Sequence, residues 1–231
     1  MPQRSGGASR GSGTRDDGKA DGRLIAPVWL CSWALGPAWL GSVRSVALNR
    51  DEVVDAACVI LDEFGLTDLT MRRLGDALGV RAGALYYHVP NKQTLLAWVS
   101  DRILADVRPV QGDWRSALSG WAWNLREVLL AHRDSADLVA SARAMGISEL
   151  DAVSAPTAAL SAAGLSHPDA DAAASALLHF VLGHVAEEQA RADWERFGQP
   201  DPDRGPTATE QTFAVGVQLL VDGVKARFSP L

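Results

Sequence analysis

The sequence is poor in cysteine, and it lacks the patterns that several classes of protein require. Among 231 residues there are two cysteines, Cys31 and Cys58, with no CxxC or Cys/His spacing. This leaves no pattern for a zinc site and suits a reducing cytoplasm, where we expect the protein to work. Zinc-protease HExxH, phosphate-binding and calcium-binding loop motifs are also missing. We therefore expect no enzyme and no cofactor.

An excess of positive charge is missing as well. The chain has 22 Lys and Arg against 28 Asp and Glu, a formal net charge of −6. Proteins that coat nucleic acid without specificity are usually basic overall, so that class is disfavoured. A local basic patch remains compatible with this total. Hydrophobic residues make up 47% of the chain, which is ample material for a buried core.

Residues 1–47 differ in composition from the rest of the chain. Residues 1–23 are rich in Gly, Ser and Arg, which predicts disorder. Residues 24–43 form an apolar run with three tryptophans and no charge. Three interpretations stay open: a translated upstream stretch or dispensable tail, a genuine extension, or a membrane-related segment. Two prolines and several Gly or Ser interruptions make it a poor spanning helix, so we expect no membrane partner.

From Leu48 onward the hydrophobic spacing is helical almost throughout, and no strand-like alternation or repeat stands out. Capping residues predict a helix from Asn49 to Gly65, short helices over 70–79 and up to Pro90, and a fourth from 91 to about 107. Longer helices are expected over 114–132, 149–163, 166–196 and 209–228, with a broken stretch through Met145 and Gly146. The prediction is an all-α protein with a helix-turn-helix domain over 48–107 and a helical-bundle domain over 108–231.

Positive charge gathers in residues 70–92, which hold four Lys or Arg against one acid, Asp76. A helix in the major groove needs small residues for close approach and a few donors for base edges. Leu85 and Val89 occupy the core face, so at most one neighbouring tyrosine is structural, and we favour Tyr87 for that role. The expected DNA-contacting residues are Thr70, Arg72, Arg81, Ala82, Gly83, Ala84, Tyr86, His88 and Lys92.

The stretch GLTDLTMRRLGDALGVRAGALYYHVPNKQTLL closely resembles the DNA-binding domain of the tetracycline-repressor (TetR) family. The resemblance implies that Arg72, Tyr86 and Lys92, together with His88, contact bases or phosphates. Residues 82–84 match positions that help to set base choice, and here they are unusually small. Arg81 is expected to compensate.

The resemblance extends to LLAHRDSADLVA and HFVLGHVAEEQ, which are similar to the ligand-binding and dimerisation helices of that family. In that family the magnesium–tetracycline site uses a histidine of one subunit and a glutamate of the partner subunit. The histidine position matches Val139 here, and the glutamate position matches Glu187. Valine cannot ligate a metal, so we expect neither a magnesium–tetracycline effector nor any metal. An apolar or aromatic effector is expected in a pocket lined by Trp121, Leu125, Leu138, Val139, Arg143, His179 and Phe180.

Two segments rich in small residues, 169–185 and 213–224, suit close helix packing across a two-fold axis. Ordinary packing within one chain is the alternative. Together these features predict a homodimeric transcriptional repressor that binds a near-palindromic, double-stranded operator and is released by a small-molecule effector. The competing hypothesis is a helical ligand-binding or adaptor protein with a degenerate DNA-binding head.

Overall fold

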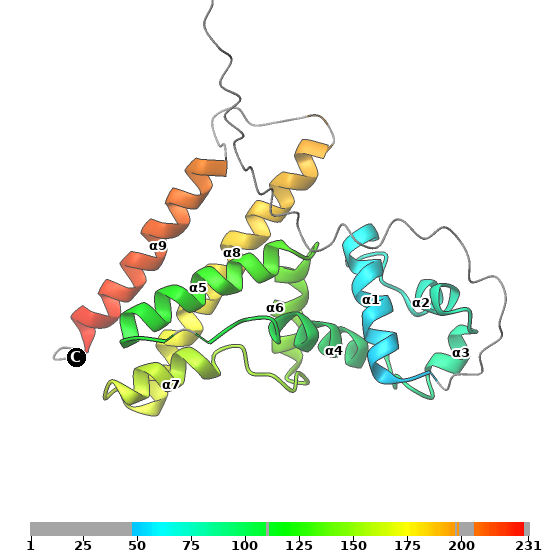
Figure 1. Cartoon of the computed structure of the whole chain (residues 1–231), viewed down its shortest axis with the longest axis horizontal. Helices are drawn as coiled ribbons and strands as arrows, with labels where there is room; N and C mark the ends of the chain where they lie inside the picture. Colours follow the sequence, from blue (N-terminus) through cyan, green and yellow to red (C-terminus); the bar gives the residue numbers. More distant parts are fainter. Residues whose placement is uncertain (1–47, 110, 197, 199–205, 229–231) are drawn as a thin grey trace, which may run out of the picture. The chain divides into compact units, whose positions relative to one another are not determined.

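The computed structural model describes residues 48–109, 111–196, 198 and 206–228 of the chain. Within these ranges the secondary structure consists of nine α-helices with no β-strand (Figure 1). The all-α prediction is therefore confirmed. The expectations for residues 1–47 lie outside the described residues. No helix in the described part of the chain is long and apolar enough to cross a membrane.

The helices have the following bounds: α1 Arg50–Phe64, α2 Met71–Leu78, α3 Ala82–Leu85, α4 Lys92–Leu104, α5 Trp114–Leu130, α6 Ser135–Met145, α7 Ser154–Ala162, α8 His167–Arg196 and α9 Pro206–Arg227. The first three lie close together, and α4 runs from them to the helices that follow (Figure 1).

Capping residues set the starts of the early helices, as the sequence predicts. The side chain of Asn49 accepts a hydrogen bond from the Glu52 amide, and the Glu52 carboxylate accepts one from the Asn49 amide. This is a complete capping box at the start of α1. Thr70 and Asn91 likewise accept from the amide three residues further on, at 3.1 Å and 2.8 Å. These predicted caps are confirmed.

The prediction of a broken stretch before Gly146 is wrong, because α6 is a continuous helix there. The turn before it is closed by side chains. Asp134 has φ 53°, in the left-handed region, and the Ser135 hydroxyl donates to the Leu129 carbonyl at 2.6 Å. Without glycine or proline to mark it, such a turn gives little sequence signal.

The helix expected from residue 149 begins later, at Ser154. The carboxylate of Asp101 on α4 accepts hydrogen bonds from the amides of Glu149 and Leu150, at 2.9 Å and 3.1 Å. These two residues are therefore held as part of a loop. The helix expected to end at Pro90 is also shorter, because α3 is a single turn and residues 86–88 continue as turns.

Helix α8 is the centre of the C-terminal part, since α5, α6, α7 and α9 all contact it (Figure 1). Its buried residues are Ala170, Ala174, Leu177, Leu178, Val181, Leu182 and Val185. On another face, the Phe180 ring stacks on Phe213 of α9 with centroids 5.5 Å apart. A side chain on Gly216 would collide with the Phe180 ring, so this glycine lets the two helices approach.

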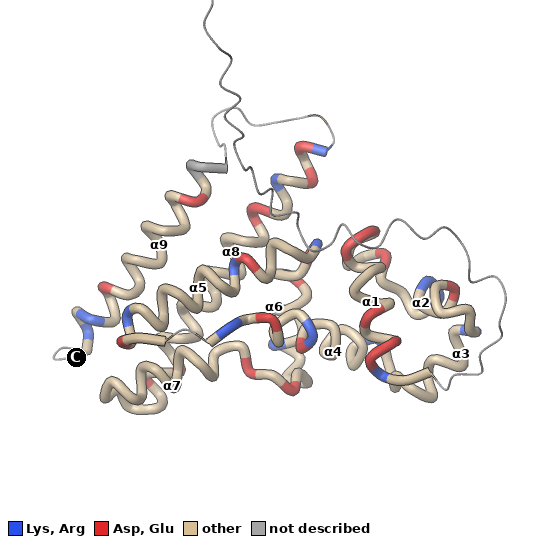
Figure 2. The backbone as a smooth tube through the Cα atoms, in the orientation of Figure 1, with Lys and Arg blue, Asp and Glu red and all other residues tan. Residues whose placement is uncertain are grey.

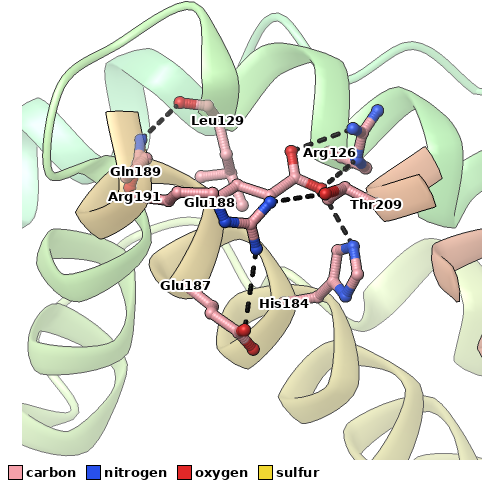
Figure 3. A network of polar contacts seen from close by, with 8 residues as sticks. All are labelled: Arg126, Leu129, His184, Glu187, Glu188, Gln189, Arg191 and Thr209. Carbon is pink, nitrogen blue, oxygen red and sulfur yellow. Dashed lines mark hydrogen bonds and ion pairs between the residues drawn. The ribbon is translucent and has the colours of Figure 1, made fainter. Parts of the chain in front are cut away.

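A buried network of charged groups joins α5 to α8 (Figure 3). The Arg126 guanidinium donates two hydrogen bonds to the Glu188 carboxylate, at 3.1 Å and 2.9 Å. His184 Nε2 lies 2.9 Å from Glu188 Oε1. Gln189 donates to the carbonyls of Leu129 and residue 132, at 3.1 Å and 2.7 Å. The same stretch of α8 therefore fixes both the middle of α5 and the turn that follows it.

Candidate DNA-binding and effector sites

Two glycines shape the tight turn between α2 and α3. Gly79 ends α2 with φ 67°, a left-handed conformation that glycine adopts without steric cost. The Val80 amide donates to the Gly75 carbonyl at 2.9 Å. A Cβ atom on Gly75 would lie 2.8 Å from the Val80 carbonyl oxygen, so the backbone of the turn lies directly against α2. The result is a helix-turn-helix of the kind that the sequence predicts.

Burial separates the residues of α3 and its following turn into a core side and an outer side. Leu85 and Val89 are fully buried, whereas Tyr86 is 53% and Tyr87 is 91% exposed. The prediction that Tyr87 is structural is therefore wrong. Tyr87 lies in the turn that follows α3, where the helical spacing no longer applies, and its side chain is directed to solvent. Tyr87 is thus a candidate DNA contact that the sequence analysis missed.

The cations of this region differ in their availability. The side chains of Arg72 and Arg81 are exposed and form no hydrogen bond or ion pair with other described residues. Arg73 is committed to the fold, because it pairs with Asp68 at 2.9 Å and lies over the Phe64 ring at 4.1 Å. Acidic residues predominate along α1, whereas α2 carries both basic and acidic residues and a basic residue, Arg81, precedes α3 (Figure 2). The outer side of α2 and α3 therefore offers free positive charge.

The remaining predicted contacts combine structural and surface roles. Thr70 caps α2 through its hydroxyl oxygen, and its O–H remains a donor. Lys92 is the first residue of α4 and is half-buried. Gly83 and Ala84 are exposed, and a Cβ on Gly83 would meet open space. Ala82 is half-buried and His88 is exposed. The front of α3 is accordingly bare enough for close approach to a groove.

Hydrogen bonds join α1 to the turn between α5 and α6. His132 Nδ1 lies 3.0 Å from Asp62 Oδ1, and Asp134 Oδ2 accepts from the Leu66 amide at 2.7 Å. The hydrogen bond that His132 donates to the Asp62 carboxylate raises the pKa of His132, although burial opposes it. Gln189 holds the same turn from the other side, so α8, the turn and α1 are linked in series.

Two neighbouring cavities lie where α4, α5, α6 and α7 meet. Trp121 and Leu125 line the larger, which has a volume of about 260 Å³. Val139 and Arg143 line the smaller, of about 180 Å³. Both cavities are also lined by Leu104, Leu150, Asp151 and Ala152. Four of the seven predicted effector contacts therefore lie around one pair of cavities.

The other three predicted effector contacts lie outside the walls of these cavities. Leu138 is fully buried in the core, His179 is exposed on α8, and Phe180 packs on α9. The rotation of α8 explains this, because the residues before and after these two, Leu178 and Val181, are the ones buried in the core. The other lining residues were not predicted, and among them Ser100 and Ser148 are lone serines in a helix and a loop, which give no sequence signal.

Comparison with known proteins places the chain in a family. The profile of bacterial regulatory proteins of the tetR family matches residues 53–99, and that of the tetracyclin repressor-like C-terminal domain matches residues 108–203. Tetracycline repressor protein class A from transposon 1721 of Escherichia coli is 33% identical over 206 residues, covering 78% of this chain and 92% of that protein.

Solved structures agree with these sequence matches. The crystal structure of Mycobacterium smegmatis BioQ matches with a TM-score of 0.71 and 41% identity, covering 78% of this chain and 99% of that one. A structure of BioQ with its double-stranded DNA operator matches with a TM-score of 0.67 and 40% identity, covering the same shares of the two chains.

The helix-turn-helix and its exposed cations define a DNA-binding protein with a helical C-terminal domain. The matches make the assignment specific. The chain belongs to the TetR family of bacterial regulatory proteins. It is a DNA-binding, ligand-responsive transcriptional regulator.

The residues present do not fit a magnesium–tetracycline effector. Val139 is buried and has an aliphatic side chain with no metal-binding atom. The Glu187 side chain is 62% exposed and lies 3.6 Å from the Arg191 guanidinium. Among the described residues there is no group of three His, Cys, Asp or Glu side chains that could hold a metal ion. The ligand set that the family resemblance implies is therefore incomplete in this chain.

Proposed function

We propose that the protein is a repressor that binds a near-palindromic operator as a homodimer and releases it when a small-molecule effector binds. Residues 48–107 bind DNA, and residues 108–231 bind the effector and the second subunit. The observation that carries the proposal is the outer side of α2 and α3. There, the side chains of Arg72 and Arg81 are exposed and unpaired among the described residues, and Gly83 and Ala84 leave the exposed surface of α3 bare.

Base discrimination falls mainly on the few long side chains of this surface. The small residues at 82–84 let α3 lie deep in the major groove but supply no side-chain hydrogen bonds. Arg72, Tyr86, Tyr87 and His88 are exposed around it and can donate to base edges or phosphates. We expect an operator with few strongly selected base pairs in each half-site.

An apolar groove between α8 and α9 supports the homodimer. Its volume is about 380 Å³, and small and aliphatic residues such as Ala173, Ala176 and Leu219 line it. In the single chain Val215 is 59% and Leu219 is 67% exposed. Large apolar side chains in contiguous exposed surface indicate a protein interface. A second copy related by a two-fold axis covers this surface and sets two helix-turn-helix units on successive major grooves, about 34–36 Å apart.

The test is selection of bound sequences from a random DNA pool, followed by fluorescence anisotropy on the selected site. Tyr86→Ala and Lys92→Ala should each weaken binding by about 1–3 kcal/mol, and Lys92→Ala should also lower the salt slope by about one. The control is Arg196→Ala, which removes an exposed arginine at the end of α8. Unchanged affinity in both head variants would favour the alternative of a helical ligand-binding or adaptor protein with a degenerate head.

The protein's role, its location and the place where its effector binds are inferred from its membership of the family. The relatives are regulators, which supports a regulatory rather than a catalytic role. A regulator that binds operator DNA works where the bacterial chromosome is, so we propose a cytoplasmic location. The effector enters at the cavities beside Trp121 and Arg143 and acts on α4, which connects them to the helix-turn-helix.

A further inference from the structure

We propose that the effector is an amphipathic carboxylic acid whose carboxylate binds beside Arg143 in the smaller cavity. The hydroxyls of Ser100 and Ser148 donate to the same carboxylate. The aromatic or aliphatic body of the acid packs against Trp121 and Leu125 in the larger cavity. This proposal rests on the proposed effector-responsive function and names the chemical class of the ligand.

Two residues that line the smaller cavity, Ser100 and Ser148, have buried hydroxyl oxygens with no hydrogen-bond partner among the described residues. Ser100 on α4 is 1% exposed, and Ser148 lies in the loop after α6. Native proteins rarely leave buried polar groups unpaired, because an unmade hydrogen bond is costly. Each hydroxyl can donate to an oxygen acceptor placed between them. The pair therefore points to a ligand that carries acceptor oxygens.

Arg143 adds charge to this set of donors. Its guanidinium donates to Asp151 at 3.0 Å and to the Ser175 hydroxyl at 3.1 Å. A guanidinium has five N–H donors, so further donors remain for a ligand. Arginine binds carboxylates through two parallel hydrogen bonds, which are stronger than neutral ones. A ligand with a cationic head would meet this guanidinium and is disfavoured.

The native partner of Arg143 is replaceable. The Asp151 side chain is 57% exposed, and ion pairs in contact with solvent contribute little free energy. An incoming carboxylate can therefore exchange for Asp151 as the partner of Arg143 at small cost, while Asp151 keeps its hydrogen bond from the Val153 amide, at 3.2 Å. The exchange keeps the guanidinium paired in both states.

The larger cavity suits the apolar part of the same molecule. Trp121 and Leu125 line it, together with aliphatic residues of α4 and α7 such as Leu104 and Ala155, and Arg108 is the one cation among the described residues of its lining. Leu104 also lines the smaller cavity, so the two sites lie on either side of shared residues. Ligand pockets typically combine such an apolar wall with a few placed polar groups. The division of chemistry between the cavities matches a ligand with one acidic end.

The residues that line both cavities form a shared wall, and hydrogen bonds and an ion pair connect this wall to the DNA-binding domain. Leu150 and Asp151 belong to both linings. The Asp101 carboxylate of α4 accepts a hydrogen bond from the Leu150 amide. The neighbouring Glu149 carboxylate forms an ion pair with the Arg50 guanidinium of α1, at 2.9 Å. A ligand that occupies both cavities must displace this wall, which pulls on α4 and α1 together. Acid binding is therefore expected to weaken operator binding.

The test uses the full chain without DNA and three matched probes: naphthoate, its primary amide and naphthylmethylamine. Isothermal titration calorimetry measures each affinity. Naphthoate should bind about tenfold tighter than the amide, because charge-assisted hydrogen bonds are roughly twice as strong as neutral ones. The amine should bind more weakly than both. Equal affinity of acid and amide, or no saturable binding of the acid, would overturn the proposal.

Variants identify the residues responsible. Arg143→Gln should abolish the preference for the acid, and Asp151→Asn should strengthen acid binding severalfold because it removes the competing carboxylate. A merely structural Arg143 would give no such gain. Arg102→Gln, which removes an exposed arginine of α4 outside the cavities, is the control and should change neither affinity. If Arg143→Gln fails to fold, the Asp151→Asn result decides, and unchanged acid affinity counts against the proposal.

Failure of this proposal is distinguishable from failure of the proposed function. Operator binding by the ligand-free protein tests the regulator alone, and naphthoate titration without DNA tests the ligand class alone. If the protein binds its operator but shows no preference for the acid, only the proposed ligand class is refuted.

Discussion

The buried ion pair between Arg126 and Glu188 predicts a large loss of stability in Glu188→Gln. The two side chains are 14% and 10% exposed and are joined by two hydrogen bonds (Figure 3). An amide in place of the carboxylate leaves the guanidinium buried without a counter-charge, and losing one partner of a buried pair costs about 3–5 kcal/mol. For a chain of this length the melting midpoint should fall by at least about 6 °C.

A matched control separates burial from simple pairing. Asp55→Asn makes the same chemical change in the pair of Asp55 with Arg102, whose side chains are 60% and 56% exposed at 3.4 Å. It should cost at most about 1 kcal/mol. Urea unfolding measures the loss of stability in the two variants. The protein concentration is kept fixed, because dimerisation makes stability concentration-dependent. Equal costs for the two variants would refute the argument that burial sets the magnitude.

Three further predictions concern single side chains. Asp101→Ala leaves two backbone amides of the loop unpaired and should lower the free energy of unfolding by about 1–3 kcal/mol in urea titrations; no measurable loss would contradict this. Because the hydrogen bond to Asp62 raises the folded pKa of His132 above its unfolded value, this pair stabilises fully below about pH 6.5, and its contribution is lost as pH rises through the folded pKa. Asp62→Asn should flatten that dependence in melts from about pH 6 to 8, and an unchanged slope would exclude the pair. Thr70→Ala removes the cap of α2 and should cost about 1 kcal/mol, whereas Thr70→Ser should cost far less.

The helix-turn-helix could be predicted from the sequence because its determinants are local. Asn49, Thr70 and Asn91 cap helices through the amide three residues ahead, and Gly79 ends a helix through its own backbone conformation. None of these interactions depends on a distant part of the chain. The spacing of the buried residues then fixes which side of each helix packs inward. Tyr87 is the exception, because it lies in the turn after α3, where the helical spacing of the core positions ends.

The candidate effector site could be predicted only in part, because its geometry depends on contacts between distant segments. Trp121, Leu125 and Val139 were proposed from their match to family positions and Arg143 as a further lining residue, and all four line the cavities. The two serines of the smaller cavity were not predicted, since Ser100 becomes part of a cavity only when the loop after α6 folds back on α4. That folding depends on hydrogen bonds from residues 149 and 150 to Asp101, 48 and 49 positions apart in sequence. The same long-range bonds explain the late start of α7, so one contact accounts for both the shifted helix and the missed residues.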